Sequence, residues 1–243
     1  MAHFYLNEQL TDAAPGTRVS ILGDEARHAV TVSRIRVGET LSIGNGRGLV
    51  VTGRVVEAGA QLSVDAADVI RTLAPMPTMT LVQALAKGGR DEQAIQAATE
   101  LGVDAVIPWA AQRSIVRWDG PKAVKGQQRW ASIVREATKQ SLRAWIPDVG
   151  DQLTTSELAR RAGSTRMLVL EPSAPVTLTS VAAEDDRRDV ILVVGPEGGV
   201  APAELDMLVH AGARAVRLGA AVLRTSTAGP AAIAVLNGAL GRW

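Results

Sequence analysis

The first part of the chain, up to about residue 73, is a series of short β-branched segments separated by glycine and acidic turns. This pattern predicts a β-rich region with strands at 19–22, 40–43, 49–56 and 62–69. Gly44–Gly48 contains Asn-Gly, a strong hairpin signal, and no helical pattern follows it, which favours a turn over a phosphate-binding loop. Leu73–Pro77 holds two prolines, which interrupt regular elements, and it predicts a linker between domains at 1–73 and 78–243.

From residue 78 onward, short apolar runs alternate with segments of helical periodicity. The apolar runs predict buried strands at 78–85, 103–109, 167–170, 189–194 and 215–218. The periodic segments predict helices at 91–101, 127–142, 154–162, from near Pro202, and at 231–240, with Thr225, Ser226 and Thr227 as candidate N-caps for the last. Strands that alternate with helices in this way predict an α/β domain built around a parallel sheet.

Two glycine-bearing loops follow predicted strands near the end of the chain. Gly195-Pro196-Glu197-Gly198-Gly199 follows one apolar run, and 219–227 follows the next. Loops at the carboxyl ends of neighbouring parallel strands form the ligand crevice of open α/β sheets. Neither a mononucleotide phosphate loop nor a dinucleotide fingerprint occurs in the sequence, which disfavours a nicotinamide-dependent dehydrogenase.

Composition narrows the classes of protein and of chemistry. The 243 residues are 47% hydrophobic, which is ample for a core. The absence of cysteine excludes disulfides, cysteine metal sites and covalent thiol catalysis. His3, His28 and His210 lack the spacing of a metal site, so no metal is expected. The N-terminus has no signal-peptide pattern and no run approaches the length of a membrane-spanning helix, so a soluble, cytoplasmic protein without a membrane partner is expected.

Basic residues are concentrated in the middle of the chain, although the net charge is only +1. Asp119 and Glu136 are the two acidic residues between positions 113 and 143, where the basic residues are Arg113, Arg117, Lys122, Lys125, Arg129, Arg135, Lys139 and Arg143. A basic segment of this kind is typical of contact with nucleic-acid phosphates, and it is also compatible with a solvated helix face.

Several motifs, taken in order along nearly the whole chain, resemble one family. They are the 23–39 segment with His28, Arg34 and Gly38-Glu39; Lys87-Gly88-Gly89-Arg90 followed by 97–103 (AATELGV); Arg113-Ser114; the 130–147 segment with Trp130, Glu136-Ala137, Gln140-Ser141, Arg143 and Pro147; and GPEGG followed by 218–228 (LGAAVLRTSTA). Together they are similar to the RsmE family of 16S rRNA uridine-N3 methyltransferases in the SPOUT superfamily. The family commonly has an acid where this chain has Ser226, and Gly229-Pro230 is unusual in the helix that follows.

The resemblance implies a small PUA-like β-barrel that helps hold RNA, followed by a SPOUT domain with a trefoil knot at about 190–236. It implies S-adenosyl-L-methionine as the cofactor, bound in a bent form and gripped largely by backbone groups of the knot loops. The implied cofactor-binding residues are Leu170, Glu171, Gly195, Pro196, Glu197, Gly198, Gly199, Leu218, Gly219, Val222, Leu223, Arg224 and Ser226. A homodimer and 16S rRNA, within the assembled small subunit, are the implied partners.

For the reaction, Arg224 is expected to stabilise negative charge on the uracil, and Glu197 to accept the proton or to position the ligand. The candidate RNA-binding residues are Arg34, Arg36, Lys87, Arg90, Arg113, Arg117, Arg135, Lys139 and Arg143. Two alternatives stay open. One is a knotted methyltransferase that acts on another RNA or on ribose O2′, and the other is an RNA-binding or ribosome-assembly protein without catalysis.

Overall fold

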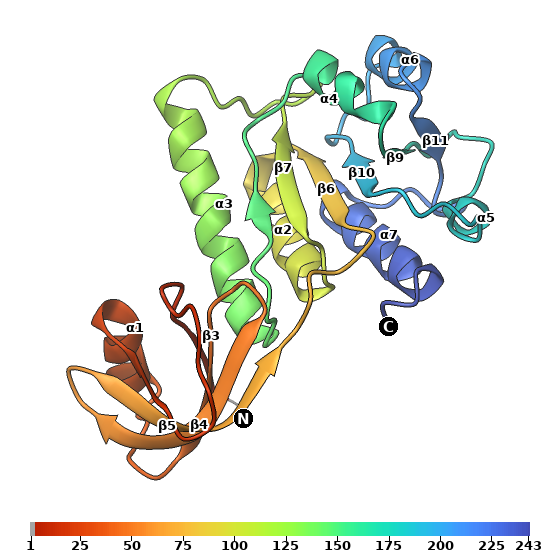
Figure 1. The fold of residues 1–243 in the computed structure, drawn as a ribbon. Coiled ribbons are helices and arrows are strands. Elements are labelled where there is room, and N and C mark those ends of the chain that lie inside the picture. The colour runs from red at the N-terminus through yellow and green to blue at the C-terminus, as the bar shows by residue number, and fades with distance from the viewer. Residues whose placement is uncertain (1–2) are drawn as a thin grey trace. The chain divides into compact units, whose positions relative to one another are not determined.

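The computed structural model describes residues 3–243, and these residues form two compact units (Figure 1). The N-terminal unit extends to Ala74 and also includes Thr138–Ile146, whereas the C-terminal unit comprises Pro75–Ala137 and Pro147–Trp243. The segment 138–146, which the sequence pattern assigned to the second domain, therefore packs within the first unit.

The N-terminal unit is built on a five-stranded sheet with the strand order β1-β3-β4-β5-β2. Its elements are β1 (Phe4–Leu6), β2 (Arg18–Ile21), α1 (Gly23–Arg27), a π-helix at His28–Val32, β3 (Thr40–Gly44), β4 (Leu49–Ala58) and β5 (Leu62–Arg71). The four predicted strands and the 44–48 turn are confirmed. Asn45 closes this turn, because its side-chain Oδ1 accepts hydrogen bonds from the backbone N–H groups of Arg47 and Leu49.

Two parts of this unit were not predicted. Strand β1 is only three residues long and pairs in parallel with β3, so its stability depends on a distant partner. The helical segment from Gly23 to Val32 lies between strands, and its apolar residues Ala26 and Ala29 are buried in the core of the sheet.

The C-terminal unit contains a six-stranded, entirely parallel sheet with the order β11-β9-β10-β6-β7-β8. Its strands are β6 (Met79–Ala84), β7 (Ala105–Trp109), β8 (Asp148–Val149), β9 (Arg166–Leu170), β10 (Val190–Val194) and β11 (Arg214–Val216). Its helices are a 3-10 turn at Lys87–Gly89, α2 (Arg90–Glu100), α3 (Pro121–Gln140, in this unit up to Ala137), α4 (Thr155–Ala162), α5 (Leu178–Ala182), α6 (Pro202–His210) and α7 (Thr225–Ala239). The predicted α/β domain with a parallel sheet is confirmed.

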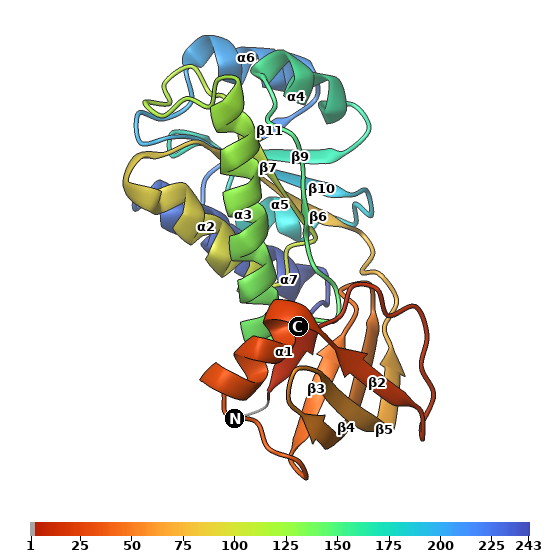
Figure 2. The same cartoon turned by 90° about the vertical axis from the view of Figure 1, so that its left-hand side faces the viewer.

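Helices cover both faces of this sheet (Figure 2). Side chains alternate along each strand, so Val82 and Ala84 of β6 join the apolar cluster under α4 and α6. Helices α2 and α7 pack against each other and against β6 and β10 on the opposite face. Residue 83, between Val82 and Ala84, therefore faces α7.

The structure corrects three predicted boundaries. Helix α3 begins at Pro121 rather than at 127, with proline in the first turn, where no hydrogen bond needs its missing N–H. Strand β11 ends at Val216 rather than at 218. Helix α7 begins at Thr225 with Arg224 in the N-cap position, and no side chain caps it, so the predicted capping by Thr225, Ser226 or Thr227 is wrong.

Candidate functional site

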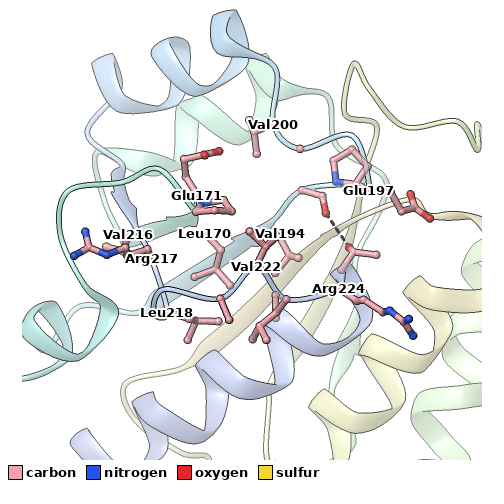
Figure 3. A pocket seen from close by; sticks show the side chains of 18 of the residues that line it. Leu170, Glu171, Val194, Glu197, Val200, Val216, Arg217, Leu218, Val222 and Arg224 are labelled. Atoms are coloured by element: carbon pink, nitrogen blue, oxygen red, sulfur yellow. Dashed lines mark hydrogen bonds between the residues drawn. The ribbon is translucent and has the colours of Figure 1, made fainter.

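A cavity of about 350 Å³ lies where the three neighbouring strands β11, β9 and β10 end (Figure 3). The loops after these strands supply its walls, together with the start of α7 and Arg90. The lining residues are Arg90, Leu170, Glu171, Pro172, Val194, Gly195, Pro196, Glu197, Gly199, Val200, Val216, Arg217, Leu218, Gly219, Ala221, Val222, Leu223, Arg224, Thr225 and Ala228. A largely apolar cavity of this size with a few polar groups is typical of a small-molecule site.

The loop after β10, residues 195–199, is held at its centre by Glu197. The carboxylate Oε1 accepts one hydrogen bond from the Arg90 guanidinium at 3.2 Å and one from the backbone N–H of Lys87 at 3.2 Å. The Glu197 side chain is only 20% exposed in this ion pair. Arg90 and Lys87 follow β6, the strand next to β10, so the ion pair joins two adjacent strand ends.

A second arginine holds the same loop. The Arg113 guanidinium, in the loop after β7, donates to the backbone oxygen of Gly198 at 3.0 Å. Glycine is required at Gly199, where φ is +73°, and at Gly195, where a Cβ would lie 2.9 Å from Cγ2 of Val200. These contacts fix the backbone of the 195–199 loop.

A buried polar pair joins this loop to α7. The Thr225 hydroxyl donates to the Gly195 carbonyl at 2.8 Å, drawn as a dashed line in Figure 3, and accepts from the Gln83 side-chain amide at 2.8 Å. Gln83 is fully buried on β6. Gln83 was not predicted to belong to the site, although a glutamine inside an otherwise apolar strand is a detectable signal, and Thr225 was predicted only as a helix cap.

The opposite wall, residues 218–224, has a different character. Val222 is 75% exposed and Leu223 39% exposed, although both line the cavity. No hydrogen bond or ion pair holds the Arg224 guanidinium within residues 3–243, and Figure 3 shows this side chain directed away from the apolar group of Leu170, Val194 and Val222. Arg224 is therefore available to an incoming molecule.

Glu171 supplies the other carboxylate of the lining. Its Oε1 accepts hydrogen bonds from the backbone N–H and the hydroxyl of Ser173, at 3.1 and 2.8 Å. Figure 3 shows its carboxylate on the side of the cavity away from Glu197. The cavity thus brings together eleven of the thirteen residues predicted to bind a cofactor, whereas Gly198 and the half-buried Ser226 do not line it.

The candidate RNA-binding residues of the C-terminal unit fall into two groups. Arg90 and Arg113 contact the 195–199 loop, and the Arg135 side chain forms an ion pair with the Glu136 carboxylate, with 3.6 Å between Nη1 and Oε1. Lys87 and Arg117 are exposed, and so are Lys122 and Lys125 near the start of α3. Arg129 is paired with Glu92, so part of the predicted basic segment is neutralised.

In the N-terminal unit, Arg34 and Arg36 are exposed, and Arg34 has a φ of +56°. Lys139 forms an ion pair with Glu25 at 3.1 Å, with only 11% of its side chain exposed, which favours a structural role for this lysine. Arg143 follows α3 and donates its backbone N–H to the Thr138 carbonyl at 3.1 Å.

Two further observations concern residues 3–243 as a whole. No three histidine, aspartate or glutamate side chains gather in an arrangement that could hold a metal ion among these residues. None of the helices in the same part of the chain combines the length and the apolar character needed to cross a membrane.

Comparison with known proteins identifies the family. Residues 74–237 match the RNA methyltransferase domain model, and residues 21–63 match the RNA methyltransferase PUA domain model, which confirms the predicted PUA-like region. Ribosomal RNA small subunit methyltransferase E from Mycobacterium bovis is 44% identical over 91% of this chain and 86% of the relative, and the Bacillus subtilis enzyme of that name is 31% identical over 92% and 90%.

A solved structure gives the same result. Ribosomal RNA small subunit methyltransferase E from Neisseria gonorrhoeae, crystallised with bound S-adenosyl methionine, superimposes with a TM-score of 0.85 at 28% identity and covers 98% of both chains. Sequence, domain models and fold agree over nearly the whole length. The chain therefore belongs to the family of ribosomal RNA small subunit methyltransferase E.

Proposed function

We propose that this chain transfers a methyl group from S-adenosyl-L-methionine to N3 of a uridine in the 16S rRNA of the small ribosomal subunit. The observation that carries the proposal is the cavity at the ends of β9, β10 and β11, in a chain similar throughout to an enzyme crystallised with S-adenosyl methionine. The uridine N3 specificity rests on the RsmE resemblance.

The residues present fit this cofactor. The apolar side chains of Leu170, Val194, Val216 and Leu218 offer contact area for a purine, and Glu171 offers a carboxylate to a hydroxyl or an ammonium group. Glycines at 195, 199 and 219 allow the backbone to approach a ligand closely. When bound, the cofactor supplies a methyl group activated by a positively charged sulfur.

The chain's own contribution to the reaction is electrostatic. N3 of uridine carries a proton near neutral pH, and each pKa unit between N3 and the working pH adds about 1.4 kcal/mol to the cost of forming the anion. Arg224, on the exposed wall and without a partner in residues 3–243, is placed to donate to O2 or O4 of the uracil as negative charge develops there.

Glu197 is better suited to positioning than to accepting the proton. Its Oε1 already accepts hydrogen bonds from Arg90 and from the Lys87 backbone, and these two contacts hold the loop. Of the two roles expected for Glu197, we therefore retain positioning.

We further propose the remaining features that the family resemblance implies. These are a trefoil knot at about 190–236, a homodimer, and an assembled small subunit as substrate, bound through the domain at 1–73 and through exposed basic residues of the domain at 78–243. Support comes from the two glycine-bearing loops that meet at one cavity, and from the exposed Arg34, Arg36 and Arg117.

The test is transfer of labelled methyl from S-adenosylmethionine to purified small subunits that lack the modification, followed by mass spectrometry of the nucleosides. We expect 3-methyluridine in the 16S rRNA. A different methylated nucleoside would redirect the proposal to another target atom. Cofactor binding without transfer to any RNA would support a binding protein, an outcome that the departure at Ser226 makes worth testing.

A further inference from the structure

A polar side chain in the middle of the C-terminal unit needs an explanation. Gln83 lies on β6, a central strand, is fully buried, and pairs in register with Val194 on one side and Pro108 on the other. Burial of an amide among apolar residues is unfavourable unless its groups form hydrogen bonds. Its Oε1 has no hydrogen-bond partner among residues 3–243. What the structure uses is the N–H₂ group.

That N–H₂ group begins a short relay. It donates to Oγ1 of Thr225 at 2.8 Å and to the carbonyl of Ala84 at 3.1 Å. The Thr225 hydroxyl, with a single proton, donates that proton to the Gly195 carbonyl at 2.8 Å. Each hydrogen bond fixes the direction of the next, because the hydroxyl accepts from the amide with a lone pair and keeps its proton for the carbonyl.

The relay joins the two sides of the cavity. Gly195 begins the loop after β10, and Thr225 begins α7 directly after the exposed wall 218–224. Both residues line the cavity, whereas Gln83 lies behind them and does not. Thr225 is not needed as a helix cap, since Arg224 occupies the N-cap position and no side-chain cap is formed. Its hydroxyl is instead hydrogen-bonded to the Gly195 carbonyl and to the Gln83 amide.

We infer that Gln83 and Thr225 are positioning residues that set the separation of the two cofactor loops and thereby the affinity for the methyl donor. The inference rests on the proposed function insofar as S-adenosylmethionine is the ligand. Gln83 acts through Thr225, and Thr225 acts through the Gly195 carbonyl. Loss of either side chain removes the contact that holds the two loops in register.

The experiment measures S-adenosylmethionine binding by isothermal titration calorimetry on the full-length chain, with thermal melting in parallel. Thr225→Val removes the hydroxyl at nearly constant volume, and Thr225→Ser keeps it. Gln83→Leu removes the amide and also the unpartnered Oε1, so its melting temperature is expected to change little. Thr227→Val is the matched control, because Thr227 is exposed in the same helical turn and does not line the cavity.

We expect Thr225→Val and Gln83→Leu each to raise the Kd by about tenfold, the value of one buried hydrogen bond. The double variant should be no weaker than Thr225→Val alone, because both changes break one relay. The Kd of Thr225→Ser should stay within about twofold of that of the unmodified chain, because the hydroxyl is kept. The Kd of Thr227→Val should do the same, because its hydroxyl lies outside the relay.

If folded Thr225→Val or Gln83→Leu binds S-adenosylmethionine with the Kd of the unmodified chain, the inference is wrong. It is also wrong if a variant melts at a lower temperature but keeps an unchanged Kd at temperatures well below its melting transition. If Thr225→Val does not fold, the Kd of Gln83→Leu tests the inference. A chain that binds the donor but yields no 3-methyluridine contradicts the proposed function alone, and the Kd series still decides the inference. A chain that does not bind the donor contradicts both.

Discussion

The two walls of the cavity differ in how they are held. The 195–199 loop is fixed by Arg90 and the Lys87 backbone at Glu197, by Arg113 at Gly198 and by Thr225 at Gly195. Residues 218–223 make no hydrogen bond within the described part of the chain, and several of their side chains are exposed. Few hydrogen bonds and high exposure characterise segments of low local stability. The 195–199 wall is therefore held in place along its length, whereas residues 218–223 are held only at their two ends, by the contacts of Arg217 and Thr225.

The largest effect is expected from the free wall. Arg224→Ala should lower kcat by about a hundredfold or more, the usual cost of removing a donor that stabilises transition-state charge. Donor affinity should stay nearly unchanged, because the fixed wall is intact. Single-turnover methyl transfer and calorimetry measure the two quantities separately. Arg214→Ala is the matched control, since Arg214 pairs with Glu184 outside the cavity. Unchanged turnover in Arg224→Ala would remove this residue from the mechanism.

The next effect concerns the ion pair of the fixed wall. Arg90→Ala and Glu197→Ala should each weaken S-adenosylmethionine binding by about tenfold, and the double variant should add little, because the two side chains act as one unit. A double-mutant cycle on the Kd tests this. If Glu197 were instead the general base, Glu197→Gln would lower kcat without changing the Kd, and Arg90→Ala would not reproduce that result.

A pair of glycine substitutions compares the two walls directly. A Cβ at Gly199 would lie 4.0 Å from Nη1 of Arg113, an ordinary contact, and a Cβ at Gly219 would meet open space, but only Gly199 has a left-handed φ, of +73°. Gly199→Ala should lower the free energy of unfolding by about 1 kcal/mol, because L-residues are strained in that region. Gly219→Ala should leave it unchanged or raise it by about 0.5 kcal/mol through a less flexible unfolded chain. Urea denaturation measures the free energy of unfolding of both variants. Equal changes in the two variants would contradict the proposed difference between the walls.

The smallest effect is expected at the ion pair of Asp186 and Arg188, whose contribution to stability depends on pH. A hydrogen bond from Arg188 lowers the pKa of Asp186 from 3.8 to about 2. A depressed carboxyl pKa contributes stability above the unfolded value, and this contribution is lost as the pH falls from 3.8 towards 2. Asp186→Asn should therefore destabilise the chain near neutral pH, by less than about 1 kcal/mol because Arg188 is more than half exposed, and the difference should vanish in acid.

The Thr225 relay contains no titratable group, so its contribution should not follow that pH dependence. Denaturation of Asp186→Asn and Thr225→Val across the acid range compares the two. If the loss of stability in Thr225→Val also disappeared at a pH below the carboxyl pKa range, the relay would depend on a charged neighbour.

Much of the fold was predictable because it depends on local patterns. Val190–Val194 is apolar and β-branched, and it forms a strand buried on both faces, as such runs do in parallel sheets. Gly102 and Gly212 follow helices and adopt the positive φ that a helix end requires. The three-residue β1 and the start of α7 were missed because distant partners stabilise them, and no local signal marks their boundaries.

The alternation of strands and helices, the glycine-bearing loops and the motifs of the family could all be predicted from the sequence, because they are properties of neighbouring residues. The contacts of the polar side chains depend instead on how distant segments pack in the folded chain. Glu197 meets Arg90 across more than a hundred positions, Gln83 meets Thr225 across still more, and Lys139 meets Glu25 rather than solvent. The first two pairs form because parallel strands bring distant loops to one edge of a sheet, where burial then requires each polar group to find a partner.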